Sequence, residues 1–277
     1  MIIFYTVDTD RHAFQALISI ISVRRYAERL KDVPIIISFV EKRKPNYERI
    51  YKKYGDIKTI VSKRFYPIHG WSNKLISSEN ISQITNDHCL SLDCDMAVVG
   101  DIEPYLTDNH FNAHMAAKYS MPKKYLQKFF NRFKIQWPEN EDYLMGNGSA
   151  GIFYPAIGVV YASAEILYSV FSNAANYARV ILNEKLNNGL KYVGQSAVTL
   201  AINKTNTPVI ALADEMAFHM QSNVIQPNLD INCKPLIIHH PSDETLLQHQ
   251  RCKTMPNVKK QAKKVVDCIF EAQKMIK

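Results

Sequence analysis

Residues 90–102 read LSLDCDMAVVGDI, a run in which two carboxylates, Asp93 and Asp95, follow an apolar segment. The residues just before them, 88–92, have the character of a buried strand. Carboxylate oxygens are the hard ligands that Mg²⁺ and Mn²⁺ prefer. A metal ion held at such a strand end could bridge two phosphate oxygens and offset charge on a diphosphate leaving group. Because D-x-D is common by chance, its meaning depends on the rest of the chain.

Upstream of this segment, predicted strands and helices alternate. Ile- and Val-rich runs predict strands at residues 2–7, 33–40, 57–61 and 88–92, and helical spacing predicts helices at 13–30, 45–54 and 71–84. This alternation indicates an α/β fold with a mainly parallel, right-handed sheet. Ligands bind beyond the carboxyl ends of the strands in open sheets. Two acidic pairs, Asp8/Asp10 and Asp93/Asp95, follow predicted strands there.

The second half of the chain is less regular. We expect strands at 114–117, 152–154, 209–212 and 235–240, helices at 159–186 and 195–203, an insertion or lid at 119–142, and a basic helix at the end. No domain boundary is evident. We therefore predict one domain of 277 residues, with a nucleotide-binding half (1–117), an acceptor-side half (118–255) and a basic C-terminal helix (256–277).

Cysteine usage and hydropathy indicate a cytoplasmic protein. The five cysteines are scattered, without CxxC spacing, which argues against a zinc site or a disulfide framework and favours a reducing compartment. No apolar run is long enough to span a bilayer. The first residues lack the basic stretch of a signal peptide.

The net charge of +8 suits anionic partners such as nucleotides, phosphates, acidic lipids or nucleic acid. Part of this charge lies in four lysines at 259–264, which we interpret as the solvated face of a helix. The alternative is peripheral contact with an anionic membrane, because the apolar residues of 265–270 could form the other side of such a helix.

The segment at 90–102 resembles the DxD signature of GT-A-fold glycosyltransferases, and most of all the retaining enzymes of family 8. The resemblance implies a single Rossmann-like GT-A (nucleotide-diphospho-sugar transferase) domain, with a mainly parallel mixed sheet flanked by helices. It implies a nucleoside-diphosphate sugar as donor, with uracil as the favoured base. It also implies Mn²⁺ or Mg²⁺ on Asp93 and Asp95, with Cys94 between them in the segment that carries the diphosphate.

Residues 4–8, FYTVD, resemble the opening strand of these enzymes, whose end holds uracil and ribose. The resemblance implies that Asp8 accepts a hydrogen bond from the base and that Thr6 or Asp10 contacts the nucleoside. Taken alone, Asp8 and Asp10 also suit a turn or an N-cap ahead of the next helix. Lys74, on the helix before the DxD strand, would meet phosphate as a point charge. The alternative interpretation is that Lys74 is exposed and solvated, with no role in binding.

Residues 235–240, PLIIHH, resemble the late strand that ends in a metal-binding histidine. His239 matches best because it directly follows the apolar run, and His240 is the second candidate. A neutral imidazole can complete a metal site that two carboxylates begin.

Two further segments resemble the sugar-binding part of the family. In residues 194–198, GQSAV, Gln195 stands where an acidic or amide residue lies beneath the sugar ring, although Gly194 replaces a common Asp. An amide oxygen could stabilise an oxocarbenium-like centre. A purely structural role for Gln195, as a residue at the start of a helix, explains it almost as well. In residues 147–153, Ser149 stands where Asn usually lines the donor sugar and acceptor.

The resemblance also implies retention of the anomeric configuration, which needs no strong base because the leaving phosphate can take the proton. Inversion needs a carboxylate base, for which Asp214 and Glu215 are candidates. The acceptor could be a glycan, a protein, a lipid or a small molecule, and no nucleic acid is expected.

Three other classes compete with this interpretation. A haloacid-dehalogenase-like phosphatase would use Asp93 as nucleophile and Asp95 as acid/base, but Ala97 replaces its Thr or Val and no Asp-Asp pair follows. A sugar nucleotidyltransferase shares the fold but typically has a glycine-rich, basic loop after the first strand, and residues 8–11 contain no glycine. A non-enzymatic nucleic-acid binder fits the charge but shows no recognised module. Only the transferase unites Asp93, Asp95 and a distant histidine in one Mn²⁺ site.

Overall fold

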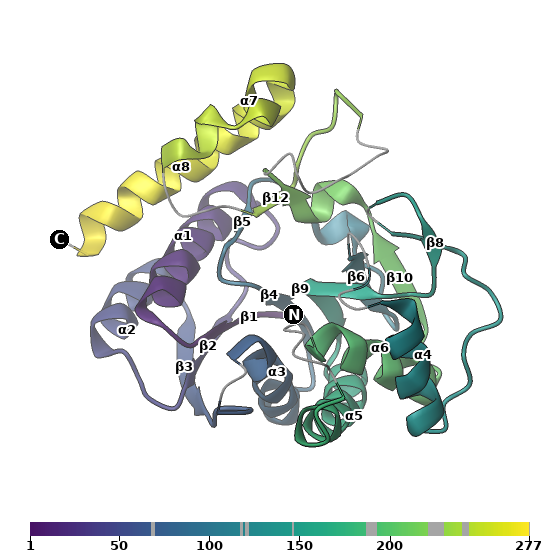
Figure 1. Ribbon diagram of the computed structural model, residues 1–277. Coiled ribbons are helices and arrows are strands. Elements are labelled where there is room, and N and C mark those ends of the chain that lie inside the picture. The colour runs from purple at the N-terminus through teal and green to yellow at the C-terminus, as the bar shows by residue number, and fades with distance from the viewer. Residues whose placement is uncertain are drawn as a thin grey trace.

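The computed structural model describes residues 1–67, 70–116, 119, 122–145, 147–186, 193–220, 230–239 and 244–276. Its centre is a seven-stranded sheet between two layers of helices (Figure 1). The strands of this sheet are β1 (Ile2–Val7), β2 (Ile35–Val40), β3 (Ile57–Ser62), β4 (His88–Leu92), β6 (Phe111–Met115), β9 (Pro155–Ser163) and β10 (Val209–Leu212). The helices are α1 (Asp10–Tyr26), α2 (Pro45–Tyr51), α3 (Asn73–Ile84), α4 (Lys123–Arg132), α5 (Ala164–Asn183), α6 (Val193–Thr205), α7 (Gln250–Thr254) and α8 (Pro256–Ile276).

The strand order is β10-β6-β9-β4-β1-β2-β3, and only β9 runs antiparallel to its neighbours. The predicted mainly parallel sheet is therefore confirmed. Because parallel strands end at the same edge, the carboxyl ends of β1, β4, β6 and β10 lie together with the start of β9. This edge carries Asp8 and Asp93.

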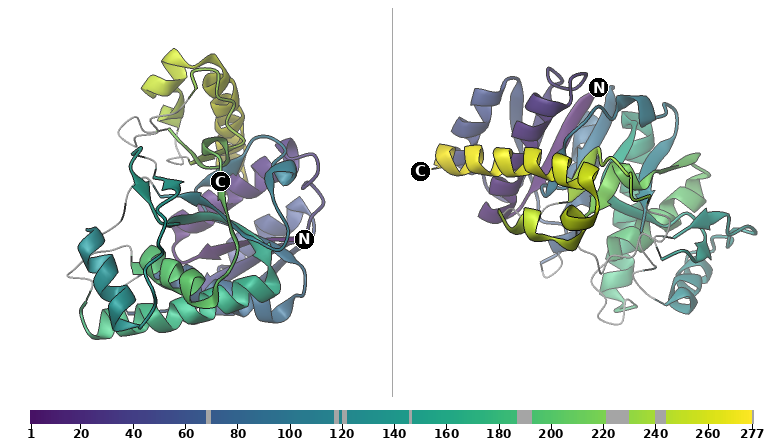
Figure 2. Two further views of the ribbon diagram at one scale, coloured as in Figure 1. Left: turned by 90° about the vertical axis from the view of Figure 1, so that its right-hand side faces the viewer. Right: turned by 90° about the horizontal axis from the view of Figure 1, so that it is seen from above.

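Both faces of the sheet are covered, as expected for a parallel sheet. Ile3, Tyr5 and Val7 of β1 belong to the core beneath α1 and α8, whereas Ile2 and Phe4 belong to the core beneath α3, α5 and α6. Figure 1 shows α1, α2 and α8 on one side of the sheet and α3, α5 and α6 on the other, and Figure 2 shows the same layers from two further sides.

A second, three-stranded sheet brings residues 237–239 close to residues 93–95, the turn between β4 and β5 that we call the DxD turn. β5 (Met96–Val98) pairs antiparallel with β12 (Ile237–His239), and β12 pairs parallel with β11 (Phe218–His219). His239 lies opposite Met96 in this register, one residue from Asp95. A further short pair is formed by β7 (Tyr143–Leu144) and β8 (Ala150–Gly151).

Several predicted boundaries agree closely with the structure. The strand at 88–92 is β4, and the strand at 209–212 is β10. The helix predicted at 45–54 is α2 followed by one 3₁₀ turn, and it ends at Gly55, whose φ of 99° suits a residue without a side chain.

The helix predicted at 159–186 is wrong in its first part. Residues 155–163 form β9, and α5 begins only at Ala164, where the Ser163 side chain accepts a hydrogen bond from the Ile166 N–H. Val159 to Ala162 are buried on both faces of the sheet, so they form a continuous apolar run that cannot be told from a helix by periodicity. The strand predicted at 152–154 is also wrong, since these residues connect β8 to β9.

The C-terminal helix is confirmed, but its apolar side is not available to a membrane. Val265, Val266 and Ile269 are buried in the core that includes α1, and of the apolar residues at 265–270 only Phe270 is exposed. Glu271 binds Arg25 of α1, and Nζ of Lys264 donates to the Val99 carbonyl. Among the described residues, no helix combines the length and the apolar character needed to cross a membrane.

Candidate active site

Asp93 is fixed at the end of β4 by its main chain. Its N–H donates to the Gly158 carbonyl at 2.7 Å, and its carbonyl accepts from the Met96 N–H at 3.1 Å, which closes a turn. Its side chain is 45% exposed, so it is accessible to a ligand while Oδ1 accepts a hydrogen bond from Lys74.

Lys74 is not the solvated lysine that we considered from sequence. It lies in the first turn of α3 with 6% of its surface exposed, and Nζ is 2.9 Å from Oδ1 of Asp93. Nζ also donates to the carbonyls of Ile157 at 2.5 Å and Gly158 at 3.4 Å. A buried ammonium group needs such partners, because its desolvation is costly. The structure therefore places a fixed positive charge at the DxD turn.

Asp95 faces the other way, toward the second sheet. Its Oδ2 lies 2.7 Å from Nε2 of His239, across 144 residues of sequence. Burial acts to lower the pKa of His239, but the hydrogen bond to Asp95 and the charges of Asp95 and Asp93 raise it above its ordinary value. Two of the three predicted metal ligands are thus in contact.

The donor atoms suit the predicted metal in type, because carboxylate oxygens and a neutral imidazole nitrogen are ligands of Mn²⁺. In this structure Oδ2 of Asp95 and Nε2 of His239, 2.7 Å apart, form a direct hydrogen bond. Within the described ranges, no three His, Cys, Asp or Glu side chains gather closely enough to hold a metal ion. Asp93 is turned toward Lys74, and His240 lies outside the described residues. Two carboxylates and an imidazole nevertheless form a chemically matched set around one turn.

Cys94 holds this turn against β1. Cys94 is 6% exposed, and its thiol donates to the Thr6 carbonyl at 3.1 Å. Burial and the charges of Asp95 and Asp93 raise its pKa well above the ordinary value, so the thiol stays protonated. The thiol therefore serves the fold.

Asp8, at the end of β1, is the centre of a polar cluster. Both of its oxygens accept from Arg64, at 3.1 and 2.8 Å, and Oδ2 also accepts from Nδ2 of Asn73 at 3.1 Å. Arg64 bonds Glu41 as well. A recess of about 690 Å³ adjoins this cluster, lined by Glu41, Val61, Ser62, Lys63, Arg64 and Pro67. In the described part of the chain, the buried hydroxyl of Thr6 has no hydrogen-bond partner.

Asp10 lies apart from this cluster. It is the first residue of α1, its side chain is 83% exposed, and it pairs with Lys44 at 2.8 Å. The N-cap of α1 is Thr9, whose hydroxyl accepts from the His12 N–H at 3.1 Å. The N-cap alternative is therefore wrong for both aspartates, because Thr9 is the cap, Asp10 is the first residue of the helix and Asp8 precedes the cap.

Gln195 and Ser149 lie in locally ordered segments. Gln195 is half-buried in the first turn of α6. A hydrogen bond of 2.9 Å between the hydroxyls of Tyr154 and Ser196 connects this turn to the residue before β9. Ser149 is exposed in the turn between β7 and β8, where its N–H and hydroxyl both donate to Oδ1 of Asn147.

Asp214 follows β10 and pairs with a histidine that the sequence did not single out. Nε2 of His114, on β6, lies 2.9 Å from Oδ1 of Asp214. His114 is buried directly after an irregularity in the β6–β9 register, a feature that commonly redirects a side chain. A lone histidine in an apolar strand usually has a structural role, so periodicity gave no signal for it.

Solved structures resemble this chain over nearly its full length, whereas no protein-family model and no curated protein sequence matches it. The galactosyltransferase LgtC, in complex with donor and acceptor sugar analogues, has a TM-score of 0.63 at 14% identity over 96% of both chains. This chain has the GT-A fold. Mouse xyloside xylosyltransferase 1 has a TM-score of 0.55 at 12% identity, over 86% of this chain and 97% of that chain. The bifunctional glycosyltransferase WbbM has a TM-score of 0.57 at 13% identity, over 99% of this chain and 51% of that chain.

Sequence reasoning also missed His219, which lies beside His239 in this GT-A fold. Burial, together with the neighbouring His239 and His114, lowers the pKa of His219 to about 3, so it is neutral. His219 sits in a two-residue strand that only the tertiary structure defines.

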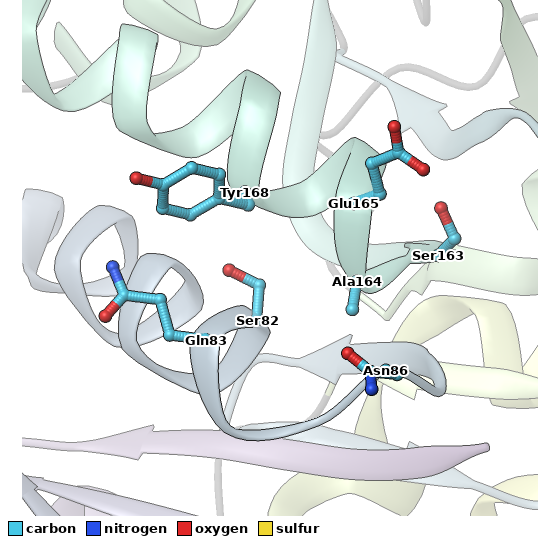
Figure 3. Close-up of a pocket in the computed structure, with 7 residues that line it drawn as sticks. All are labelled: Ser82, Gln83, Asn86, Ser163, Ala164, Glu165 and Tyr168. Atoms are coloured by element: carbon cyan, nitrogen blue, oxygen red, sulfur yellow. The ribbon is translucent and has the colours of Figure 1, made fainter.

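One recess of the GT-A fold lies away from these residues. It has a volume of about 420 Å³ and is lined by Ser82, Gln83, Asn86, Ser163, Ala164, Glu165 and Tyr168 (Figure 3). Ser163 pairs with His88 at the start of β4, whereas Asp93 follows the other end of that strand. This recess is therefore at the opposite edge of the sheet from the DxD turn.

Proposed function

We propose that this chain is a metal-dependent glycosyltransferase that moves a sugar from a nucleoside-diphosphate sugar to a glycan, protein or lipid acceptor. The observation that carries the proposal is the turn after β4. It holds Asp93 against Lys74 of α3 and Asp95 against His239 of β12. The turn lies at the sheet edge where α/β folds bind ligands, and fixed positive charge beside carboxylates suits a metal-bound diphosphate.

The residues divide the chemistry between them. Asp93, Asp95 and His239, with His240 as the second candidate, would hold Mn²⁺ or Mg²⁺, which neutralises charge on the departing diphosphate. Lys74 holds Asp93 in place and adds its own positive charge beside that leaving group. Because the ammonium is already desolvated and fixed, it needs little reorganisation when that charge develops.

A UDP-sugar is the donor we favour. The Asp8 carboxylate is a hydrogen-bond acceptor at the end of β1 and could receive the ring N–H of uracil, with Arg64 and Asn73 fixing its position. Thr6, in β1 two residues before Asp8, is the further nucleoside candidate. Asp10, exposed and bound to Lys44, is the weaker nucleoside candidate.

On the sugar side, Gln195 and Ser149 are the proposed donor contacts. One solved structure of LgtC is an active-site glutamine-to-glutamate mutant, so LgtC has a glutamine at its active site. By analogy, Gln195 would lie beneath the transferred sugar and the reaction would retain the anomeric configuration. Asp214, oriented by His114, is the carboxylate that an inverting reaction would use.

The phosphatase and nucleic-acid-binding alternatives gain no support from the fold, whereas the sugar nucleotidyltransferase class shares it and is disfavoured by the missing glycine-rich loop at residues 8–11. Phosphatase chemistry and nucleic-acid binding were alternatives from sequence, and the solved structures described above are glycosyltransferases. A cytoplasmic location and the division of the chain near residues 117 and 255 stay predictions.

Thermal unfolding with UDP, GDP, CDP and ATP, each with and without Mn²⁺, tests the proposal. A ligand at 100 times its Kd stabilises the native state by about 2.7 kcal/mol, which for a chain of this size raises Tm by roughly 5 °C. We expect this rise for UDP with Mn²⁺, and its loss in Asp93→Asn and Asp95→Asn proteins. The exposed Asp32→Asn variant is the matched control. The proposal is wrong if no nucleotide shifts Tm, or if both site variants respond like the wild type.

A further inference from the structure

A second histidine lies directly behind His239. His219 and His239 are partners in the parallel pairing of β11 with β12, and their rings meet edge to face with centroids 4.7 Å apart. The two Nδ1 atoms are 3.0 Å apart, within hydrogen-bond distance. His239 therefore has a polar partner on each side of its ring, Asp95 at Nε2 and His219 at Nδ1.

The protein fixes His219 independently of any ligand. Its carbonyl accepts a hydrogen bond from the Arg251 guanidinium, which also lies over the ring of the preceding Phe218 at 5.1 Å. Arg251 belongs to α7, which precedes α8. The C-terminal helices thus help to hold the short strand that carries His219.

The contact between two like nitrogen atoms constrains which of them carries hydrogen. A hydrogen bond between the two Nδ1 atoms needs one donor and one acceptor, since a neutral imidazole has one of each. For Nε2 of His239 to ligate a metal beside Asp95, Nε2 must present its lone pair, and the ring hydrogen must sit on Nδ1. In that state Nδ1 of His219 must be the acceptor.

We propose that His219 is a positioning residue: it accepts the hydrogen bond from Nδ1 of His239 and so holds Nε2 toward the metal position beside Asp95. This inference rests on the proposed metal-dependent function. Partners that orient a ligating histidine in this way typically contribute 10- to 100-fold to metal affinity.

The test is the affinity of the purified chain for Mn²⁺, measured from the electron paramagnetic resonance signal of free Mn²⁺, with Mn²⁺ alone and with UDP. His219→Leu fills the space without an acceptor, whereas His219→Asn places an amide oxygen near the position of Nδ1. We expect His219→Leu to bind Mn²⁺ about 10- to 100-fold more weakly and His219→Asn to stay close to the wild type. The metal-free Tm of each variant reports whether it is folded.

Three outcomes would overturn the inference. If His219→Leu binds Mn²⁺ like the wild type while His239→Ala and Asp95→Asn do not, the metal site stands and His219 has no positioning role. If the Leu and Asn variants lose affinity alike, His219 supports the local structure only. If His239→Ala itself binds Mn²⁺ like the wild type, the metal role of His239 fails, and the inference fails with it.

A direct readout is available from nuclear magnetic resonance of ¹⁵N-histidine-labelled protein with Mg²⁺ and UDP. We expect the ring hydrogen of His239 on Nδ1. A ring hydrogen on Nε2 in that complex contradicts the proposed hydrogen-bond direction.

Discussion

Nζ of Lys74 lies 2.9 Å from Oδ1 of Asp93 although the lysine is only 6% exposed. The same ammonium group donates to two main-chain carbonyls at the start of β9. One side chain therefore joins α3, the DxD turn and β9. This arrangement explains how a carboxylate that is nearly half exposed can keep one orientation.

The first prediction concerns this ammonium group. Lys74→Met keeps most of the volume and removes the charge, so we expect Mn²⁺-dependent binding of UDP to weaken by at least tenfold, as measured by calorimetry. Stability should fall by only about 1–2 kcal/mol, the cost of removing the lysine donor from the Ile157 carbonyl, because the Gly158 carbonyl still accepts from the Asp93 N–H. Lys128→Met, on the exposed side of α4, is the matched control. Unchanged affinity in Lys74→Met would remove the lysine from the proposed site.

The second prediction concerns the close approach of β9 to Asp93. A Cβ atom at Gly158 would lie 2.7 Å from Cε of Met96 and 3.1 Å from Oδ2 of Asp93. The flexible end of Met96 can move away from the new methyl group. The contact with Oδ2 remains, so the Asp93 carboxylate should change its orientation. We expect Gly158→Ala to lower stability by about 1–3 kcal/mol and to weaken Mn²⁺-dependent nucleotide binding.

Gly194→Ala is the stability control for that variant. Its Cβ would make ordinary contacts of 3.6 and 3.8 Å within α6, where Ala is favoured over Gly by up to about 1 kcal/mol. Its Tm should equal or exceed that of the wild type. A Gly158→Ala protein that is as stable as Gly194→Ala and binds nucleotide normally would contradict the predicted clash.

The third prediction is a loss of stability at alkaline pH. Burial raises the pKa of Cys89 and Cys268 from 9.0 to about 12. Between those values the unfolded thiols lose protons and the native ones do not, so stability falls as pH rises above about 9. From pH 8 to pH 10 the two thiols together should cost about 2–3 kcal/mol.

This loss can be measured by urea unfolding in the presence of a reductant. Cys89→Ala/Cys268→Ala should be less stable than the wild type at pH 8, yet lose about 2–3 kcal/mol less between pH 8 and pH 10. Buried tyrosines titrate in both proteins, so their contribution cancels. Parallel pH profiles would show that these thiols do not carry the effect.

The fourth prediction distinguishes a core helix from a surface helix at the C-terminus. Ile269 of α8 is fully buried, whereas its neighbour Phe270 is 44% exposed. Ile269→Ala should lower the free energy of unfolding by about 2–4 kcal/mol, and Phe270→Ala should change it by no more than about 0.5 kcal/mol. Similar small effects in both variants would mean that α8 is not packed as described.

The sequence by itself determined the parallel α/β architecture and the place of the DxD turn. Buried parallel strands form short, Ile- and Val-rich runs, and helices show their own period, so β4 was predicted residue by residue. The same local signal failed at β9, where a strand buried on both faces continues into a helix without a change in apolar character. The boundary depended on the cap at Ser163.

The family resemblance pointed to His239 and Lys74, but only the tertiary structure decided which contacts these side chains make around that turn and added His219 to them. Asp95 meets His239 because β5 pairs with β12, and His219 stands behind His239 because β12 pairs with β11. These short strands derive their register from each other rather than from a local period. Likewise, Lys74 bonds Asp93 because the fold buries the lysine side chain against the start of β9. Contacts across 144 residues of chain leave no trace in local periodicity, because they exist only once the sheets have formed.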